Sequence, residues 1–180
     1  MRITIVPYFP LAAPAGARLA EGLAGLFDCA ADLAAFAPPP ARQPPSGQCA
    51  ARVFLDDLRD RRSQRSAAGA VLLGVTDADL GAKRMNFVFG EADRDARVAV
   101  VSLHRLGSAG GTEAEPGRII QDRLLKEAVH ECGHVADLDH CEDPRCVMHF
   151  SSAVADTDYK GPGFCAACQK KLAQYGHGTG

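Results

Sequence analysis

Apolar and polar positions follow a strand pattern and a helix pattern in turn over the first part of the chain. Residues 2–6 alternate apolar and polar side chains, which predicts a strand, and residues 15–27 place leucines at helical spacing, which predicts an amphipathic helix. Residues 30–37 are a weaker strand candidate because they are rich in alanine. Residues 48–62 have a second helical pattern, and the continuous apolar run 70–75 predicts a buried strand.

The second half begins with two more strand candidates, followed by a long helical pattern. The candidates are residues 85–89 and 98–103, and the charged segment 91–97 is expected to be a turn between them. Apolar residues cover most of the helix surface over residues 116–138, so we expect that helix to be central and buried. Strands that alternate with helices predict an α/β layer architecture. Two segments rich in proline or glycine are expected to be irregular: residues 38–47 and 107–111.

The end of the chain has a different character. Regular patterning stops after Asp139, large apolar residues become scarce, and four cysteines gather. We expect a single domain over residues 1–180, made of an α/β part, residues 1–138, and a small cysteine-rich subdomain, residues 139–180. A last helix is expected over residues 165–175. A segment with so little apolar surface needs a staple such as a bound metal to be stable.

Composition narrows the classes of partner. The chain has 180 residues, 47% of them hydrophobic, and a net charge of -2, so it can form a core but has no electrostatic attraction for nucleic acid or an anionic membrane. A signal-peptide pattern is not visible, and no apolar run reaches the ~20 residues of a membrane span. We therefore expect a cytoplasmic protein. In a reducing compartment, seven cysteines favour metal ligation over disulfides.

The most specific chemical pattern is His130-Glu131-x-x-His134 in the long helix, followed by His140. Residues four apart lie on one face of a helix, so His130 and His134 can present both imidazoles to one ion. His140 can supply a third ligand if the helix ends soon after His134 and the chain turns back sharply. Asp137 lies at that turn, and aspartate is one of the few residues that tolerate a positive φ.

Three histidines can hold a zinc ion and leave one coordination position open. Such an ion polarises a carbonyl, and Glu131 lies where it can accept a proton from water, so the pattern predicts metal-assisted hydrolysis of an amide bond. A lone histidine on a buried helix is usually a hydrogen-bonded core residue, but two with a glutamate between them are hard to explain in that way. His104 and His149 are candidates for an oxyanion stabiliser, and each is also explained as a structural or surface histidine.

The alternative function is a non-catalytic zinc module that binds a partner protein. Glu131 favours the enzyme, because a binding module does not need a carboxylate beside the metal. For the enzyme, the cofactor is zinc and the partner is a peptide or protein substrate.

The four C-terminal cysteines form two close pairs, Cys141 with Cys146 and Cys165 with Cys168. Two such pairs bridged by a loop are typical of a closed four-cysteine zinc site, which stabilises a fold and takes no part in chemistry. Two disulfides, or a redox-active pair at Cys165 and Cys168, are the alternatives. The remaining cysteines are expected to be buried core residues, the last of them alternatively a thiol near the first site: Cys29, Cys49 and Cys132.

These linked motifs resemble the signature of the archaemetzincins, a branch of the metzincin zinc peptidases. The strong match covers residues 124–168, and a weaker likeness extends upstream through residues 74–77 and 87–90 to 101–103. The resemblance implies two zinc ions per chain. The implied ligands of the catalytic zinc are His130, His134 and His140. The implied ligands of the structural zinc are Cys141, Cys146, Cys165 and Cys168.

The resemblance also implies a metzincin-like fold, with a twisted mixed sheet, flanking helices, a central zinc-binding helix and the C-terminal subdomain below the cleft. Glu131 would be the general base, and Met148 the methionine of a tight turn beneath the histidines. Residues 85–89 would form a strand along the upper rim of the cleft, where an extended peptide can pair with its edge. The family usually has glycine at Asp137, a departure that bears on how His140 reaches the metal.

Overall fold

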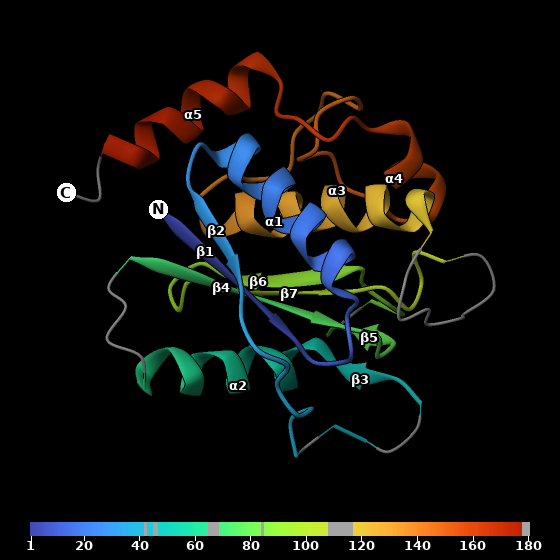
Figure 1. Ribbon diagram of the computed structural model, residues 1–180. Coiled ribbons are helices and arrows are strands. Elements are labelled where there is room, and N and C mark those ends of the chain that lie inside the picture. The colour runs from blue at the N-terminus through green and yellow to red at the C-terminus, as the bar shows by residue number, and fades with distance from the viewer. Residues whose placement is uncertain (42, 45–46, 65–68, 84, 108–116, 178–180) are drawn as a thin grey trace.

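A five-stranded mixed sheet lies at the centre of the molecule (Figure 1). The computed structural model of the chain describes residues 1–41, 43–44, 47–64, 69–83, 85–107 and 117–177. The strands of the sheet, in chain order, are β1 Arg2–Pro7, β2 Ala30–Leu33, β4 Ala70–Thr76, β6 Gly90–Asp93 and β7 Val98–Ser102. Their order in space is β2-β1-β4-β7-β6. The pairs from β2 to β7 are parallel, whereas β6 is antiparallel to β7 and lies at one edge.

Helices cover both faces of this sheet. Helix α2, Ala51–Gln64, lies on one face, and α1, Ala13–Phe27, lies with α3, Arg118–Val135, on the other (Figure 1). Because both faces are covered, every residue of β4 and β7 is buried. Successive residues of a strand point to opposite faces, so Leu72 belongs to the core under α2 and Leu73 to the core under α1 and α3.

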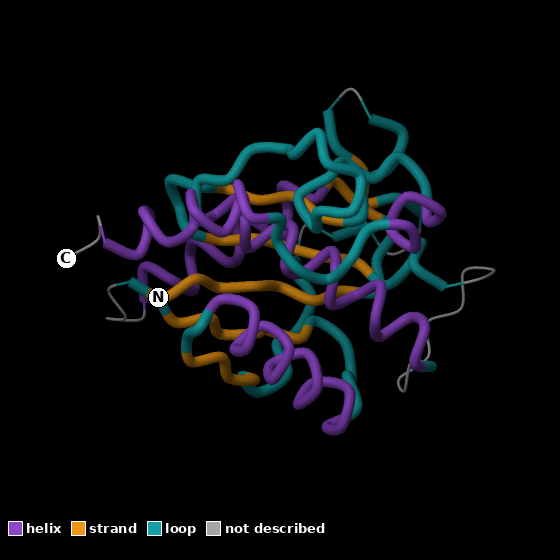
Figure 2. The backbone as a smooth tube through the Cα atoms, turned by 90° about the horizontal axis from the view of Figure 1, so that it is seen from above, coloured by secondary structure: helices purple, strands orange, loops and turns teal. Residues whose placement is uncertain are grey.

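The α/β layer prediction is confirmed, and most predicted elements are present with small shifts at their ends. The helices predicted over residues 15–27, 48–62, 116–138 and 165–175 are found at Ala13–Phe27, Ala51–Gln64, Arg118–Val135 and Ala166–His177, the last being α5. The strands predicted over residues 2–6, 70–75 and 98–103 are β1, β4 and β7. The alanine-rich candidate 30–37 is a strand only as far as Leu33. Seen from above, the strands run side by side across the molecule (Figure 2).

The strand predicted over residues 85–89 is wrong. That segment forms no strand beyond an isolated bridge between Ala82 and Met85, and the antiparallel strand is β6, most of which lies in the stretch 91–97 that was expected to be a turn. The apolar residues of the segment serve a different purpose, because Phe87 and Phe89 pack edge to face with ring centroids 5.3 Å apart and line a cleft. An edge strand needs fewer apolar residues than a central one, which is why charged β6 was not detected.

Three short elements were not predicted because so few residues give no periodic signal. They are the parallel pair β3, Cys49–Ala50, and β5, Leu80–Gly81, and the helix α4, Val154–Tyr159. Residues 38–47 form no helix or strand where they are described, and only residue 107 of the glycine-rich segment 107–111 lies within the described residues. Within the described residues, none of the helices has the length and apolarity to cross a membrane.

Candidate functional site

The three histidines predicted from the sequence lie together. His130 and His134 extend from the last turns of α3, and His140 follows the end of that helix. Their ligand nitrogens all lie within 4.8 Å of one another, and the Nε2 atoms of His130 and His134 are 3.1 Å apart. Nitrogens bound to one tetrahedral zinc at ~2.05 Å are separated by about 3.4 Å, so this spacing fits a zinc ion.

Backbone carbonyls orient two of these imidazoles. His130 Nδ1 lies 2.8 Å from the carbonyl oxygen of Val147, and His134 Nδ1 lies 2.8 Å from that of Leu138. A carbonyl only accepts, so each Nδ1 is the protonated nitrogen and donates. The Nε2 atom of each ring is then an unprotonated donor of electron pairs, as a metal ligand requires.

Burial keeps the histidines in the neutral form that binds metal. Desolvation is the main cause that lowers the pKa of His130 to about 2 and that of His134 to about 4. The pKa of His140, which is more exposed, is also lowered by desolvation. Cationic Lys160 lowers the pKa of His130 and His140 further. Protons therefore compete weakly for these nitrogens at neutral pH.

The turn that brings His140 to the triad forms at Asp137. Asp137 adopts a left-handed conformation with φ 64°, as its position in the sequence led us to expect. Its N–H donates to His134 O and the next N–H, of Leu138, donates to Gly133 O, both at 3.0 Å, which is the hydrogen-bond pattern of a Schellman helix end. The aspartate thus adopts the conformation usual for glycine here, at a strain of roughly 1 kcal/mol.

Met148 packs beneath the helix that presents the histidines. It is fully buried, and a Cβ added at Gly133 would overlap its sulfur. Gly133 lies between His130 and His134 in the sequence, and only a residue without a side chain at this position lets the methionine approach this closely. This placement agrees with the turn implied for Met148.

A cleft of about 550 Å³ opens over the triad. Glu131 lines it together with the three histidines, although only 6% of the residue is exposed. Burial raises the pKa of Glu131, and the nearby carboxylates of Glu127 and Glu91 raise it further, while Lys160 opposes them. Glu131 is therefore a stronger base than a solvated carboxylate.

Glu127, which lines this cleft, forms a buried ion pair with Lys160 that the sequence did not reveal. Lys160 Nζ lies 3.1 Å from Glu127 Oε1, and both side chains are nearly inaccessible. The hydroxyl of Thr157 donates to the same Glu127 oxygen at 2.7 Å. The helix that carries Glu127 was predicted to be central and buried, but the partner of Glu127 belongs to the C-terminal segment, and no local signal links the two.

Other candidates from the sequence do not line the cleft with the triad. Neither His104 nor His149 is among the described residues that line the cleft: His104 lines a neighbouring hollow, and His149 Nδ1 lies 2.8 Å from Cys141 O. Cys132 is fully buried in the core, and desolvation raises the pKa of its thiol. Cys49 is buried as expected, whereas Cys29 is only partly buried.

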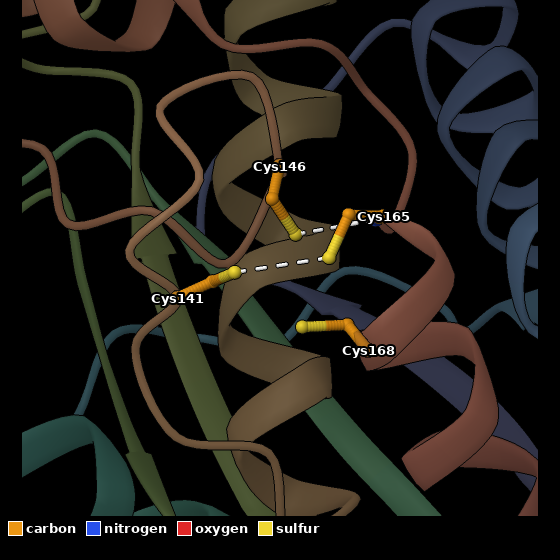
Figure 3. A group of neighbouring side chains, drawn as sticks. All are labelled: Cys141, Cys146, Cys165 and Cys168. Carbon is orange, nitrogen blue, oxygen red and sulfur yellow. Dashed lines mark hydrogen bonds between the residues drawn. The ribbon is translucent and has the colours of Figure 1, made fainter.

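The four C-terminal cysteines form a second cluster (Figure 3). Cys141 and Cys146 come from the segment after α3, Cys165 directly precedes α5 and Cys168 lies in its first turn, and the four sulfurs point toward one another. All four sulfurs lie within 4.8 Å of one another, and those of Cys141 and Cys165 are 3.8 Å apart. Sulfurs bound to one tetrahedral zinc at ~2.3 Å are separated by about 3.8 Å, so this cluster also fits zinc.

Backbone N–H groups donate hydrogen bonds to two sulfurs of this cluster and so favour their thiolate forms. The N–H of Cys165 donates to the sulfur of Cys146 at 3.3 Å. Donation from the N–H of Cys168 is the main cause that lowers the pKa of Cys165 to about 7. Desolvation instead raises the pKa of Cys146 and Cys168. The cluster lies beside the triad, because Cys141 follows His140 directly and its N–H donates to Met148 O at 2.9 Å.

Comparison with known proteins identifies the family of the chain. The sequence profile of Peptidase family M54 matches residues 44–174. The archaemetzincin of Natronomonas pharaonis is 36% identical over 177 residues, which cover 96% of this chain and 99% of that protein. The chain spans a smaller share, 65%, of some other curated archaemetzincins that it matches.

Solved structures share the fold. The crystal structure of the archaemetzincin from Methanopyrus kandleri has a TM-score of 0.79 and 32% identity, over 98% of this chain and 96% of that one. The structure of a zinc-dependent peptidase from Methanocorpusculum labreanum has a TM-score of 0.80 and 26% identity, over 94% and 99% of the two chains. With its histidine triad and four-cysteine cluster, the chain belongs to Peptidase family M54, the archaemetzincins, and is a zinc metallopeptidase of that family.

Proposed function

We propose that this peptidase binds two zinc ions with different tasks. His130, His134 and His140 hold the catalytic ion, and the four cysteines, Cys141, Cys146, Cys165 and Cys168, hold a structural one. The donor sets support this division, because three histidines leave a coordination position open while four thiolates fill every position. A four-thiolate site needs reduced cysteines, so we also propose that the protein works in the cytoplasm.

The observation on which the catalytic proposal rests is the placement of Glu131 in the same cleft as the triad. Zinc, when bound there, supplies a Lewis acid that polarises the scissile carbonyl and lowers the pKa of water. The Glu131 carboxylate takes a proton from the attacking water and then passes it to the nitrogen of the leaving amine. Its buried position excludes bulk water and raises its basicity, and both effects favour these transfers.

The substrate is proposed to lie along β6. This strand is at the edge of the sheet, and its residues Gly90, Glu91 and Ala92 line the cleft. The open side of an edge strand offers backbone groups that an extended peptide can pair with, which would align its carbonyl over the triad. Apolar side chains also line the cleft: Met85, Phe87 and Phe89 come from the segment before β6, and Phe150 comes from the C-terminal segment. We therefore propose that cleavage is favoured beside apolar side chains.

The test compares wild-type protein with Glu131→Ala. Zinc content is measured by atomic emission, and cleavage is measured on a mixed peptide library. Two zinc ions in both proteins, with cleavage only by the wild type and mainly beside apolar residues, is the expected result. Two zinc ions but no cleavage by either protein would instead favour a non-catalytic zinc module that binds a partner protein.

A further inference from the structure

Arg94 connects the turn between β6 and β7 with the segment that follows α3. It lies in the turn between β6 and β7, which the side chain of Asp93 stabilises by accepting from the N–H of Ala96 at 2.8 Å. The Arg94 guanidinium contacts three consecutive residues after α3. Its Nη1 lies 3.0 Å from Asp137 Oδ1, and its Nη2 lies 3.1 Å from Leu138 O and 2.6 Å from Asp139 Oδ1.

The contacted segment orients two members of the triad. The carbonyl of Leu138 accepts from Arg94 and also from His134 Nδ1, so one oxygen links the guanidinium to the imidazole. Asp139 is the residue before His140. A displacement of this segment would therefore move the ring of His134 and the backbone of His140 together.

We propose that Arg94 is a positioning residue for the catalytic metal site, and that it stabilises the left-handed turn at Asp137. The inference rests on the proposed function, because it takes the histidine triad as the zinc-binding set. Asp137 strains the turn that a glycine would form freely, but its carboxylate gives Arg94 an anionic partner. The side chain that departs from the family pattern is thus part of the contact that holds the turn.

An arginine suits this position better than a lysine. A guanidinium presents several N–H donors in a fixed plane, so it can contact the two carboxylates and the carbonyl between them at the same time. A lysine ammonium is a compact charge, and it would retain the attraction to Asp137 and Asp139 without the planar arrangement of donors. Arg94→Lys should therefore restore only part of what Arg94→Ala removes.

The first experiment measures zinc affinity at each site by competition with a chelator. We expect Arg94→Ala to weaken zinc at the histidine site by ~10-fold, as is usual when a partner of a metal ligand is lost, and to leave the cysteine site unchanged. Arg105→Ala is the matched control, because Arg105 has nearly the same exposure (41% against 39%) and pairs with Asp79, away from the triad. Equal weakening by both variants, or no weakening by Arg94→Ala, would overturn the inference.

A second substitution isolates the turn. In an Asp137→Gly background the turn needs no support against strain, so Arg94→Ala should weaken zinc binding by clearly less than ~10-fold. Equal effects of Arg94→Ala in the two backgrounds would show that the arginine does not act through Asp137.

Amide hydrogen exchange tests the inference without a measurement of zinc binding. The N–H groups of Asp137 and Leu138 close the turn, and in Arg94→Ala they should exchange faster than in wild type, with no change in the N–H groups of β4. This measurement uses the protein as purified. If wild type binds no zinc at the triad, the proposed function fails, yet the exchange result still decides whether Arg94 holds the turn.

Discussion

Gly90 lies directly against Glu131. A Cβ built at Gly90 would come within 2.6 Å of Glu131 Cγ and 2.7 Å of the carbonyl oxygen of Val100. The first residue of the edge strand is therefore small because the proposed general base occupies the space where its side chain would be. Backbone on one side and a buried carboxylate on the other leave no room for adjustment.

Gly90→Ala should lower kcat/KM by on the order of 100-fold, because an added methyl group must displace Glu131 or the strand by a fraction of an ångström or more. Zinc content should stay at the wild-type level, since no histidine of the triad is among the atoms nearest to the added Cβ. Peptide cleavage assays and metal analysis check this. Gly25→Ala is the control, because nothing lies within 4 Å of its added Cβ; comparable losses in both variants would contradict the prediction.

His140→Ala should weaken zinc at the first site by more than the ~10–100-fold that loss of an outer partner causes, because a direct ligand is removed. The affinity of the cysteine site should change little, and chelator competition measures both. His104→Ala is the matched control, since His104 lies outside the triad. Retention of wild-type affinity in His140→Ala would mean that the first site does not use this histidine.

Cys168→Ser should remove the second zinc and lower the melting temperature of the protein. The free energy of zinc binding adds to folding stability, and the C-terminal segment has few large apolar residues to replace it. Metal analysis and thermal unfolding measure these changes. Cys29→Ser, which alters a cysteine outside the cluster, should keep both ions; an unchanged zinc count in Cys168→Ser would rule out the structural site.

Lys160→Met should reduce the free energy of unfolding by ~3–5 kcal/mol, because it leaves the buried carboxylate of Glu127 without its cation. Urea denaturation measures the change. The double variant with Glu127→Gln should recover much of the loss, since no uncompensated charge then remains. Lys170→Met removes an exposed lysine and should have little effect. A loss equal to that of Lys170→Met would show that the pair contributes nothing to stability.

The chemistry of both sites could be predicted from local sequence, because their spacing is fixed by helix and turn geometry. Two residues four apart, such as His130 and His134, lie on the same face of a helix whatever the fold. Asp137 follows three residues later and forms the left-handed turn that the sequence predicted there. The members of each cysteine pair are likewise close in the sequence, so a short loop is enough to bring them together. Strands buried on both faces, such as β4, were recognisable from their continuous apolar runs.

Contacts between distant segments were decided by the tertiary structure alone. The sequence placed the cleft-side strand at residues 85–89, but the sheet pairs Gly90–Asp93 with β7, because an edge strand can be charged and the apolar residues before it line the cleft. The contacts of Gly90 with Glu131, Arg94 with Leu138 and Lys160 with Glu127 join segments far apart in the chain. Periodicity reports which face of an element is buried, but the partner on that face depends on how the layers pack.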